Sequence, residues 1–164
     1  MQLYLVRHAH AVTEQENPQR PLSSRGRDEC ARLVGFLKRN RAFSPTLIWH
    51  SPLIRALETA RLLAEGLNLE AALVETSGLL PEDDPEKILS RLENAAPKQT
   101  IAIVGHEPFL GALATLLVRG KPQPVAFDIK KGAVLALEST GGVHKKTGKP
   151  RWHVCWQIDP TLLD

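Results

Sequence analysis

The sequence predicts an α/β protein, a three-layer α/β/α sandwich around a mostly parallel, mixed sheet. Short apolar runs alternate with segments of helical periodicity through the first 120 residues, and this alternation is typical of a parallel sheet covered by helices. Two strand-like runs then follow each other near the C-terminus, which predicts an antiparallel hairpin in the same sheet. A chain of 164 residues without a linker or an internal repeat suits one domain over 1–164.

The first third of the chain predicts a strand, a loop and a helix. Residues 2–6 are a short apolar run typical of a buried strand, and residues 8–22 form a polar loop that contains proline. Ser23 or Ser24 can cap the helix that follows. The apolar positions of that helix recur at the i, i+3, i+4, i+7 spacing of one helical face and are Cys30, Leu33, Val34 and Leu37.

A second strand and helix follow Pro45. The strand covers 46–50, and the helix covers 51–66 with Ser51 as N-cap, Pro52 at its first position and Gly66 at its end. The face expected to be apolar carries Leu53, Leu57, Ala60 and Ala64.

The remaining residues repeat the alternation and then form the hairpin. Asp84 precedes a proline at a predicted helix start, and Gly120 ends a later helix. The expected elements are a weak strand over 71–75, a helix over 83–95, a strand over 100–105, a helix over 108–119, and strands over 133–138 and 152–158.

Basic side chains follow three of the predicted strands. Ligands of open α/β sheets bind outside the carboxyl ends of the strands, so these side chains are expected at one edge. The residues are Arg7 and His8 after the first strand, His50 and Ser51 after the second with Arg55 one helical turn on, and His106 after the strand over 100–105. Two arginines, two histidines and a helix N-terminus at one edge predict an anion site, and phosphate is the natural ligand.

Four sequence blocks in this order resemble the histidine phosphatase superfamily, which has the phosphoglycerate mutase-like fold. The chain is most similar to the short bacterial branch of protein phosphohistidine phosphatases of the SixA type. The blocks are "LYLVRHAHA" from residue 3, "RPLSSRG" from residue 20, "SPLIRALETA" from residue 51 and "VGHEP" from residue 104.

The resemblance implies a phosphatase that forms a covalent phosphohistidine on His8, without a metal or another cofactor. Arg7, Arg55 and His106 would bind the phosphoryl oxygens, and Arg20 is a further substrate-binding candidate. The substrate expected for this branch is phosphohistidine on a signalling or phosphotransfer protein. Glu82 is the candidate general acid, although a phosphohistidine substrate depends less on one because its imidazole can leave as a neutral group.

The motifs differ from the family pattern at two positions. Ala9 stands where the superfamily has glycine, which predicts that the backbone there has an ordinary negative φ. His10 stands where close relatives often carry aspartate. Arg20 could also pair with a loop carboxylate such as Glu14 or Glu16 and thereby order the loop.

Other readings of the same residues stay open. His8, His10, His50 and His106 could be ligands of a metal hydrolase, although an alternating pair at a strand end points to opposite sides. A phosphatase of the same superfamily could act on a small molecule, and Ala9 together with His10 would fit a non-catalytic phosphohistidine-binding module.

Composition limits the partners that the chain is expected to have. The formal net charge is +3, too small for a nucleic-acid binder but compatible with anionic ligands. No run is long and apolar enough for a membrane span, so no membrane partner is expected. Cys30 and Cys155 lack metal-type spacing and are expected as two buried free thiols of a cytoplasmic protein. Nothing in the sequence indicates an oligomeric state.

Overall fold

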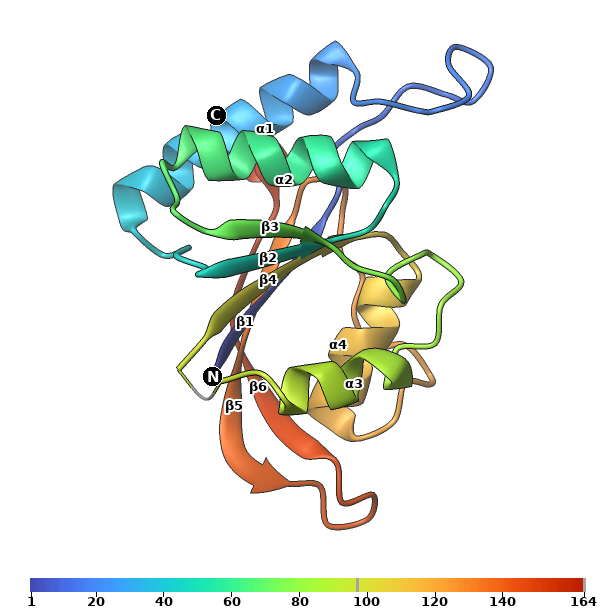
Figure 1. The fold of residues 1–164 in the computed structure, drawn as a ribbon, viewed down its shortest axis with the longest axis vertical. Helices are drawn as coiled ribbons and strands as arrows, with labels where there is room; N and C mark the ends of the chain where they lie inside the picture. The colour runs from blue at the N-terminus through green and yellow to red at the C-terminus, as the bar shows by residue number, and fades with distance from the viewer. Residues whose placement is uncertain (97, 164) are drawn as a thin grey trace.

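The computed structural model describes residues 1–96 and 98–163 and contains a six-stranded mixed sheet with the order β3-β2-β4-β1-β5-β6 (Figure 1). Helices cover both faces of this sheet, as the sequence predicts. The strands are β1 (Gln2–Arg7), β2 (Leu47–His50), β3 (Ala72–Glu75), β4 (Thr100–Gly105), β5 (Val134–Val143) and β6 (Pro150–Ile158).

The parallel half of the sheet is centred on β4. This strand pairs in parallel with β1 on one side and with β2 on the other, and β3 continues the parallel half beyond β2. On the far side of β1, β5 runs antiparallel from Val6↔Val134 to Gln2↔Glu138, and β6 returns beside it. The carboxyl ends of β1, β4 and β2 therefore lie side by side at one edge.

Each face of the sheet has its own apolar core. The helices α1 (Ser24–Asn40) and α2 (Ile54–Gly66) cover one face, and α3 (Glu86–Glu93) and α4 (Phe109–Arg119) cover the other (Figure 1). Successive residues of a strand point to opposite faces, so Leu3 and Leu5 of β1 face α3 and α4, whereas Tyr4 and Val6 face α1 and α2. Both faces of β1 are buried, which gives the functional edge a rigid base.

The predicted start of α1 is confirmed, and the predicted start of α2 is wrong. Ser23 caps α1 by accepting a hydrogen bond from the amide of Gly26 (3.1 Å). In α2, by contrast, Leu53 is the N-cap, with no hydrogen bond from its own side chain, and the helix begins at Ile54. Pro52 lies before the helix because Ser51 continues the strand ladder, its amide donating to the carbonyl of Val104 (3.0 Å).

The buried face of α2 is also rotated from the predicted one. Leu53 and Leu57 are only partly buried, and the buried residues are Ala56, Thr59, Ala60, Leu63 and Ala64. Small side chains on this face let α2 lie close to the sheet and to the segment that follows β1. The strands β5 and β6 extend beyond the predicted apolar runs, since the hairpin continues as an exposed ladder to Val143↔Pro150.

The two cysteines differ in burial. Cys30 is buried under the loop that follows β1, as predicted, but Cys155 is exposed on β6. The prediction of a second buried thiol is wrong because a register shift in β6 opposite Ala136 and Leu137 breaks the regular alternation of faces around Cys155. Within 1–96 and 98–163, the helices are all too short or too polar to span a bilayer.

Candidate active site

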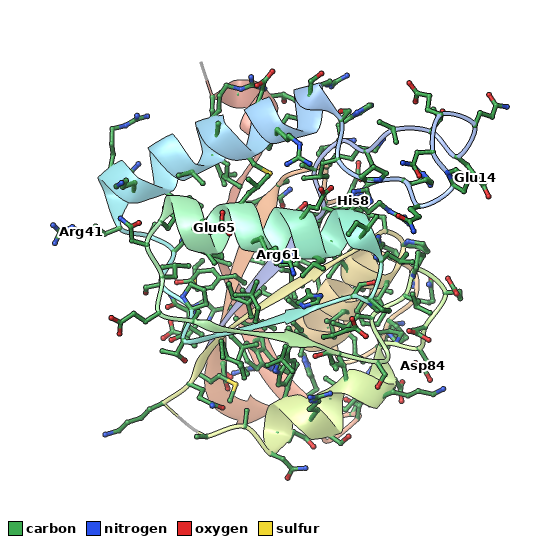
Figure 2. The ribbon with its side chains drawn as sticks, turned by 45° about the horizontal axis from the view of Figure 1, so that its top comes forward. His8, Glu14, Arg41, Arg61, Glu65 and Asp84 are labelled. Carbon is green, nitrogen blue, oxygen red and sulfur yellow. The ribbon has the colours of Figure 1, made fainter. Side chains whose placement is uncertain are left out.

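The candidate site lies at the carboxyl ends of β1, β4 and β2. The amide of His8 donates to the carbonyl of Gly105 (3.0 Å), so the residue after β1 stays in register with the end of β4. Ser51, the residue after β2, is bonded to β4 in the same way, through its amide and the carbonyl of Val104. Figure 2 shows His8 at this edge, between the loop that carries Glu14 and the loop that carries Asp84.

The ring of His8 is held with one nitrogen free. His8 is 6% exposed, and its Nδ1 lies 2.7 Å from the carbonyl oxygen of Ala9. A carbonyl only accepts, so Nδ1 carries the proton and Nε2 keeps its lone pair. The pKa of His8 is lowered to about 3, chiefly by burial; the positive charges of Arg55 and Arg7 act in the same direction, and the Ala9 carbonyl opposes them. The imidazole is therefore neutral near pH 7 and is a competent nucleophile.

His106 faces His8 and has the complementary arrangement. The two ring centroids are 5.0 Å apart, and Nε2 of His106 lies 2.8 Å from Oγ of the fully buried Ser51. That oxygen also accepts from the amide of Leu53 (3.3 Å), and we assign its O–H as the donor to Nε2. Nδ1 of His106 then carries the proton and has no acceptor among the described residues. Burial, followed by the charges of Arg55 and Arg7, lowers the pKa of His106 to about 3.

Both predicted arginines bring unpartnered donors to the histidines. Arg7 donates through one Nη to the carbonyl of Ile129 (2.9 Å), which fixes its guanidinium, and Arg55 projects from the first turn of α2. Within the described residues, four buried side-chain nitrogen or oxygen atoms lack a hydrogen-bond partner, and three of them are Arg7 Nε, Arg55 Nε and His106 Nδ1. Buried donors without acceptors are costly. Their concentration here indicates a site built for an oxyanion.

Side chains from two of the motif blocks fix the segment that follows β1. Thr59 of α2 accepts from the amide of Ala9 (3.1 Å) and donates to the carbonyl of Arg55 (2.7 Å), so one hydroxyl joins the two halves of the site. Glu58 accepts from the amide of Leu22 (2.6 Å) and thereby ties the far end of the loop to α2. Gly26 lies directly on the backbone of His10, where a Cβ would overlap the carbonyl oxygen.

Ala9 and His10 fit this arrangement without strain. The non-glycine residues with positive φ in the described chain are Arg20, Arg41 and Asn68, so the predicted ordinary φ of Ala9 is confirmed. His10 turns away from the histidine pair: its Nδ1 lies 2.8 Å from Ser23 Oγ, and its amide donates to Glu29 (3.0 Å).

Arg20 lies near the site but does not form the predicted ion pair. Its Nε donates to the carbonyl of Val12 (3.2 Å), while Glu16 accepts instead from Thr13, and no ion pair joins Arg20 to Glu14 or Glu16 in the described structure. The residue instead turns the loop through a left-handed backbone conformation, with φ of 51°. The positive charge of Arg20 contributes to the lowered pKa values of Arg55 and His106, so it belongs to the electrostatic surroundings of the site.

Glu82 does not contact the pair of histidines. It is exposed in the segment between β3 and α3, and among the described residues no hydrogen bond or ion pair joins it to Arg7, His8, Arg55 or His106. Its neighbours have local roles, since Asp83 accepts from the amide of Leu80 (2.7 Å) and Asp84 from that of Glu86 (2.9 Å). The segment borders the same edge as His8 (Figure 2), so the role of Glu82 as general acid stays a prediction.

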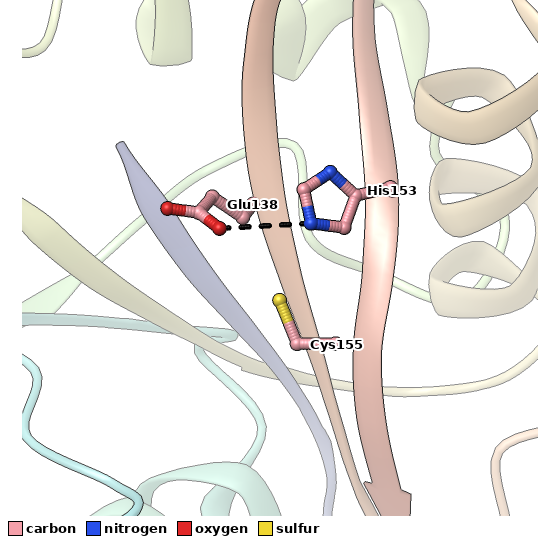
Figure 3. A group of neighbouring side chains, drawn as sticks. All are labelled: Glu138, His153 and Cys155. Carbon is pink, nitrogen blue, oxygen red and sulfur yellow. Dashed lines mark ion pairs between the residues drawn. The ribbon is translucent and has the colours of Figure 1, made fainter.

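Potential metal ligands gather at a different place. In 1–96 and 98–163, the one group of three or more is Glu138, His153 and Cys155, whose ligand atoms lie within 4.8 Å of one another on β5 and β6 (Figure 3). All three are exposed, and Glu138 pairs with Gln2 at the start of β1, the opposite end from Arg7. His50, which the metal reading would also use, places its Nδ1 3.0 Å from the carbonyl of Ser51.

Sequence reasoning placed Ser51 at the binding edge but did not assign it a role in the site. Ser51 was expected to cap α2, but its hydroxyl contacts His106 instead. The available signal was its position directly after β2. A residue at that position continues the hydrogen-bond ladder to β4 and points across the ends of the strands.

A six-stranded mixed sheet with two facing histidines and two arginines at its carboxyl edge defines an α/β protein with a site suited to an oxyanion. Residues 3–79 match the family model of the histidine phosphatase superfamily (branch 1). A protein of Picosynechococcus sp. that carries no assigned function is 31% identical over 144 residues, which are 85% of this chain and 86% of that one. The chain belongs to the histidine phosphatase superfamily and is a phosphatase of that superfamily.

Solved structures share the fold over nearly the whole chain. The protein histidine phosphatase SixA complexed with tungstate matches with a TM-score of 0.77 and 23% identity, covering 99% of each chain. The α-ribazole phosphatase from Shigella flexneri matches with a TM-score of 0.68 and 20% identity, covering 92% of this chain and 95% of that one. The predicted phosphoglycerate mutase-like fold is confirmed.

Proposed function

We propose that the protein dephosphorylates phosphohistidine on another protein, through a covalent phosphohistidine intermediate on His8. The observation that carries this proposal is the free Nε2 of His8, which faces His106 across 5.0 Å between ring centroids. A neutral nucleophile and a ring of unpartnered donors are what phosphoryl transfer requires, since its transition state spreads charge over the equatorial oxygens.

In the first step, Nε2 of His8 attacks phosphorus, and the bond from phosphorus to the leaving nitrogen of the substrate breaks. The donors on Arg7, Arg55 and Nδ1 of His106 bind the oxygens of the transferring group. The leaving imidazole takes the electron pair of the broken bond and, from solvent, a proton. As the bond to phosphorus forms, the His8 ring becomes positively charged, and its Nδ1–H donates more strongly to the Ala9 carbonyl.

In the second step, a water attacks the phosphorus bound to His8. The P–N bond breaks, its electron pair returns to Nε2, and the proton lost by the water goes to the product phosphate. The same donors serve both steps because the phosphoryl group stays between Arg7, Arg55 and His106. No proton on the enzyme has to be relocated between turnovers.

Three observations support phosphohistidine as the substrate. Among the described residues no carboxylate is bonded to His8 or His106, which fits a leaving group that needs little acid assistance. A similar fold belongs to a protein histidine phosphatase SixA. The edge is also ringed by cationic side chains, among them Arg20 and Arg25, which can attract an acidic partner protein. Arg25 and Arg27 contribute less than Arg20, because they are paired with Glu29 at 3.0 Å and with Glu58 at 2.7 Å.

The similarity to α-ribazole phosphatase favours a second candidate, a small-molecule phosphatase with the same His8 chemistry. The deciding experiment compares kcat/KM for a phosphohistidine peptide, a sugar phosphate, a phosphoserine peptide and a phosphotyrosine peptide. We expect phosphohistidine to lead by at least about tenfold, roughly 1.4 kcal/mol in transition-state stabilisation. Faster turnover of the sugar phosphate would overturn phosphohistidine as the substrate but would not contradict the covalent mechanism on His8.

A further inference from the structure

A cavity of about 410 Å³ adjoins the phosphoryl site on the Arg7 side. Its charged lining residues are Arg7, Arg25, Glu29, Lys130, Lys131 and Asp159. Arg7 is common to the cavity and to the phosphoryl site, which places the two next to each other.

The ion pairs of the lining leave two cations without a carboxylate partner. Arg25 pairs with Glu29 (3.0 Å), and Lys130 pairs with Asp128 outside the cavity. Asp159 accepts from the amide and the hydroxyl of Thr161. Among the described residues, Lys131 and Arg7 have no ion pair.

Lys131 is held among other positive charges. Burial lowers the pKa of Lys131, and the positive charges of Arg7, Arg20 and Arg25 add to this effect, partly offset by Glu29. Like charges at this proximity repel, and an anion placed between them relieves the repulsion. The transferring phosphoryl group interacts with Arg7 and Arg55, which leaves Lys131 available for a second negative group.

The backbone fixes Lys131 beside Arg7. The amide of Gly132 lies 3.1 Å from the carbonyls of both Arg7 and His8, and the amide of Arg7 donates to the carbonyl of Ala133 (3.2 Å). Gly132 has φ of +72°, so the chain turns sharply there at little conformational cost.

The other end of this segment is tied to α4 and to Arg7. Glu107 accepts from the amides of Ile129 (2.8 Å) and Gly111 (2.9 Å), while the carbonyl of Ile129 accepts from Arg7. Residues 129–133 thus form a bonded strap across the end of β1.

We propose that Lys131 and this cavity form a second anion subsite, which selects substrates carrying another carboxylate or phosphate beside the phosphoryl group that is removed. The proposal rests on the phosphoryl site at His8 described above. For a protein substrate the second anion is an acidic side chain next to the phosphohistidine, and for a small molecule it is a second phosphate.

The test measures kcat/KM for two matched substrate pairs. One pair is a phosphohistidine peptide flanked by Glu and the same peptide flanked by Gln, and the other is a hexose bisphosphate and its monophosphate. We expect the substrate with the second anion to lead its partner by about two- to fivefold, the range of one partly exposed ion pair. Lys131→Gln should remove this preference, and Lys131→Glu should reverse it.

Lys145→Gln is the matched control, because Lys145 is exposed in the β5–β6 hairpin, away from the phosphoryl edge, and its loss changes the net charge equally. The ratio within each pair should stay at the wild-type value in this control. Since a ratio of two substrates cancels general damage to the enzyme, it separates selection by Lys131 from a folding defect.

The outcomes distinguish the subsite from the proposed function. Hydrolysis of both peptides at equal kcat/KM, unaffected by Lys131→Gln, would overturn the subsite and keep the proposed substrate. A Lys131-dependent preference for the bisphosphate, with no turnover of either peptide, would support the subsite and overturn the proposed substrate. A ratio that falls equally in Lys145→Gln would show that net charge alone selects the substrate, which also overturns the subsite.

Discussion

Replacement of Ser51 by alanine tests whether the tautomer of His106 is set by a single hydroxyl. The substitution removes Oγ from the position 2.8 Å from His106 Nε2 and creates no overlap, because alanine is smaller. His106 would then have no described partner on either ring nitrogen. Its proton could reside on Nε2, in which case Nδ1 would present a lone pair to the phosphoryl oxygen and repel it.

The magnitude follows from the burial of the group. A buried hydrogen bond whose partner is removed costs about 1–3 kcal/mol, and Ser51 is fully buried. The bond acts on a donor that contacts the reacting phosphoryl group, so we expect kcat/KM to fall about 10- to 100-fold, which corresponds to about 1.4–2.7 kcal/mol.

The assay combines kinetics with ¹⁵N NMR of the imidazole nitrogens. Wild type should show the Nδ1–H tautomer of His106, Ser51→Ala a mixture, and Ser51→Thr should restore much of both the tautomer and the rate. Thr115→Val is the control, since Thr115 is another fully buried hydroxyl, bonded within α4 to the carbonyl of Gly111 (2.6 Å). It should lower stability without changing the His106 signals. An unchanged Nδ1–H tautomer and a rate within about twofold of wild type in Ser51→Ala would refute the reasoning.

Three further predictions concern the same edge. His8→Ala should abolish turnover and the acid-labile, base-stable phosphoprotein adduct seen after rapid quenching, and full activity in this variant would disprove the nucleophile assignment. Glu82→Gln should lower kcat/KM for a phosphoserine peptide by about tenfold but for a phosphohistidine peptide by less than about threefold, and equal losses would rule out a leaving-group role. The pKa values of His8 and His106 are lowered from 6.5 to about 3, so the unfolded chain binds more protons between these values and the free energy of unfolding should fall as pH drops below 6.5. Each histidine contributes up to about 1.4 kcal/mol per pH unit, and urea titrations of His106→Ala should show a shallower pH dependence than wild type.

The sheet was predictable because most of its strands coincide with short, uninterrupted apolar runs in the sequence. The run over 100–105 coincides with β4, and the weak strand expected over 71–75 is β3 at the sheet edge. Parallel strands buried on both faces have this pattern, and turn residues bound each run. The hairpin was less predictable, because the outer parts of β5 and β6 are exposed and their residues carry little apolar signal.

The start of α2 was not predictable from local rules. Ser51 and Pro52 have the residue types that favour the N-cap and the first helical position, but tertiary hydrogen bonds to β4 hold Ser51 in extended conformation. The free energy of a cap is about 1 kcal/mol, and the ladder bond together with the bond to His106 outweighs it. Arg20 shows the same limit, since the carbonyl of Val12 and the left-handed backbone, rather than a nearby carboxylate, determine its position.

The candidate site combines what the sequence predicts with what only the packed structure supplies. Arg7 ends β1, and His8 and His106 directly follow strands, so the topology rule brings them to one edge before any side-chain detail is known. The protonation pattern depends instead on the carbonyl of Ala9 and the hydroxyl of Ser51, whose positions come from backbone geometry. A lone pair on His8 Nε2 and a proton on His106 Nδ1 are opposite states of two similar rings. The enzyme therefore needs no shared proton between the histidines, and each ring can be perturbed separately through the group that holds it.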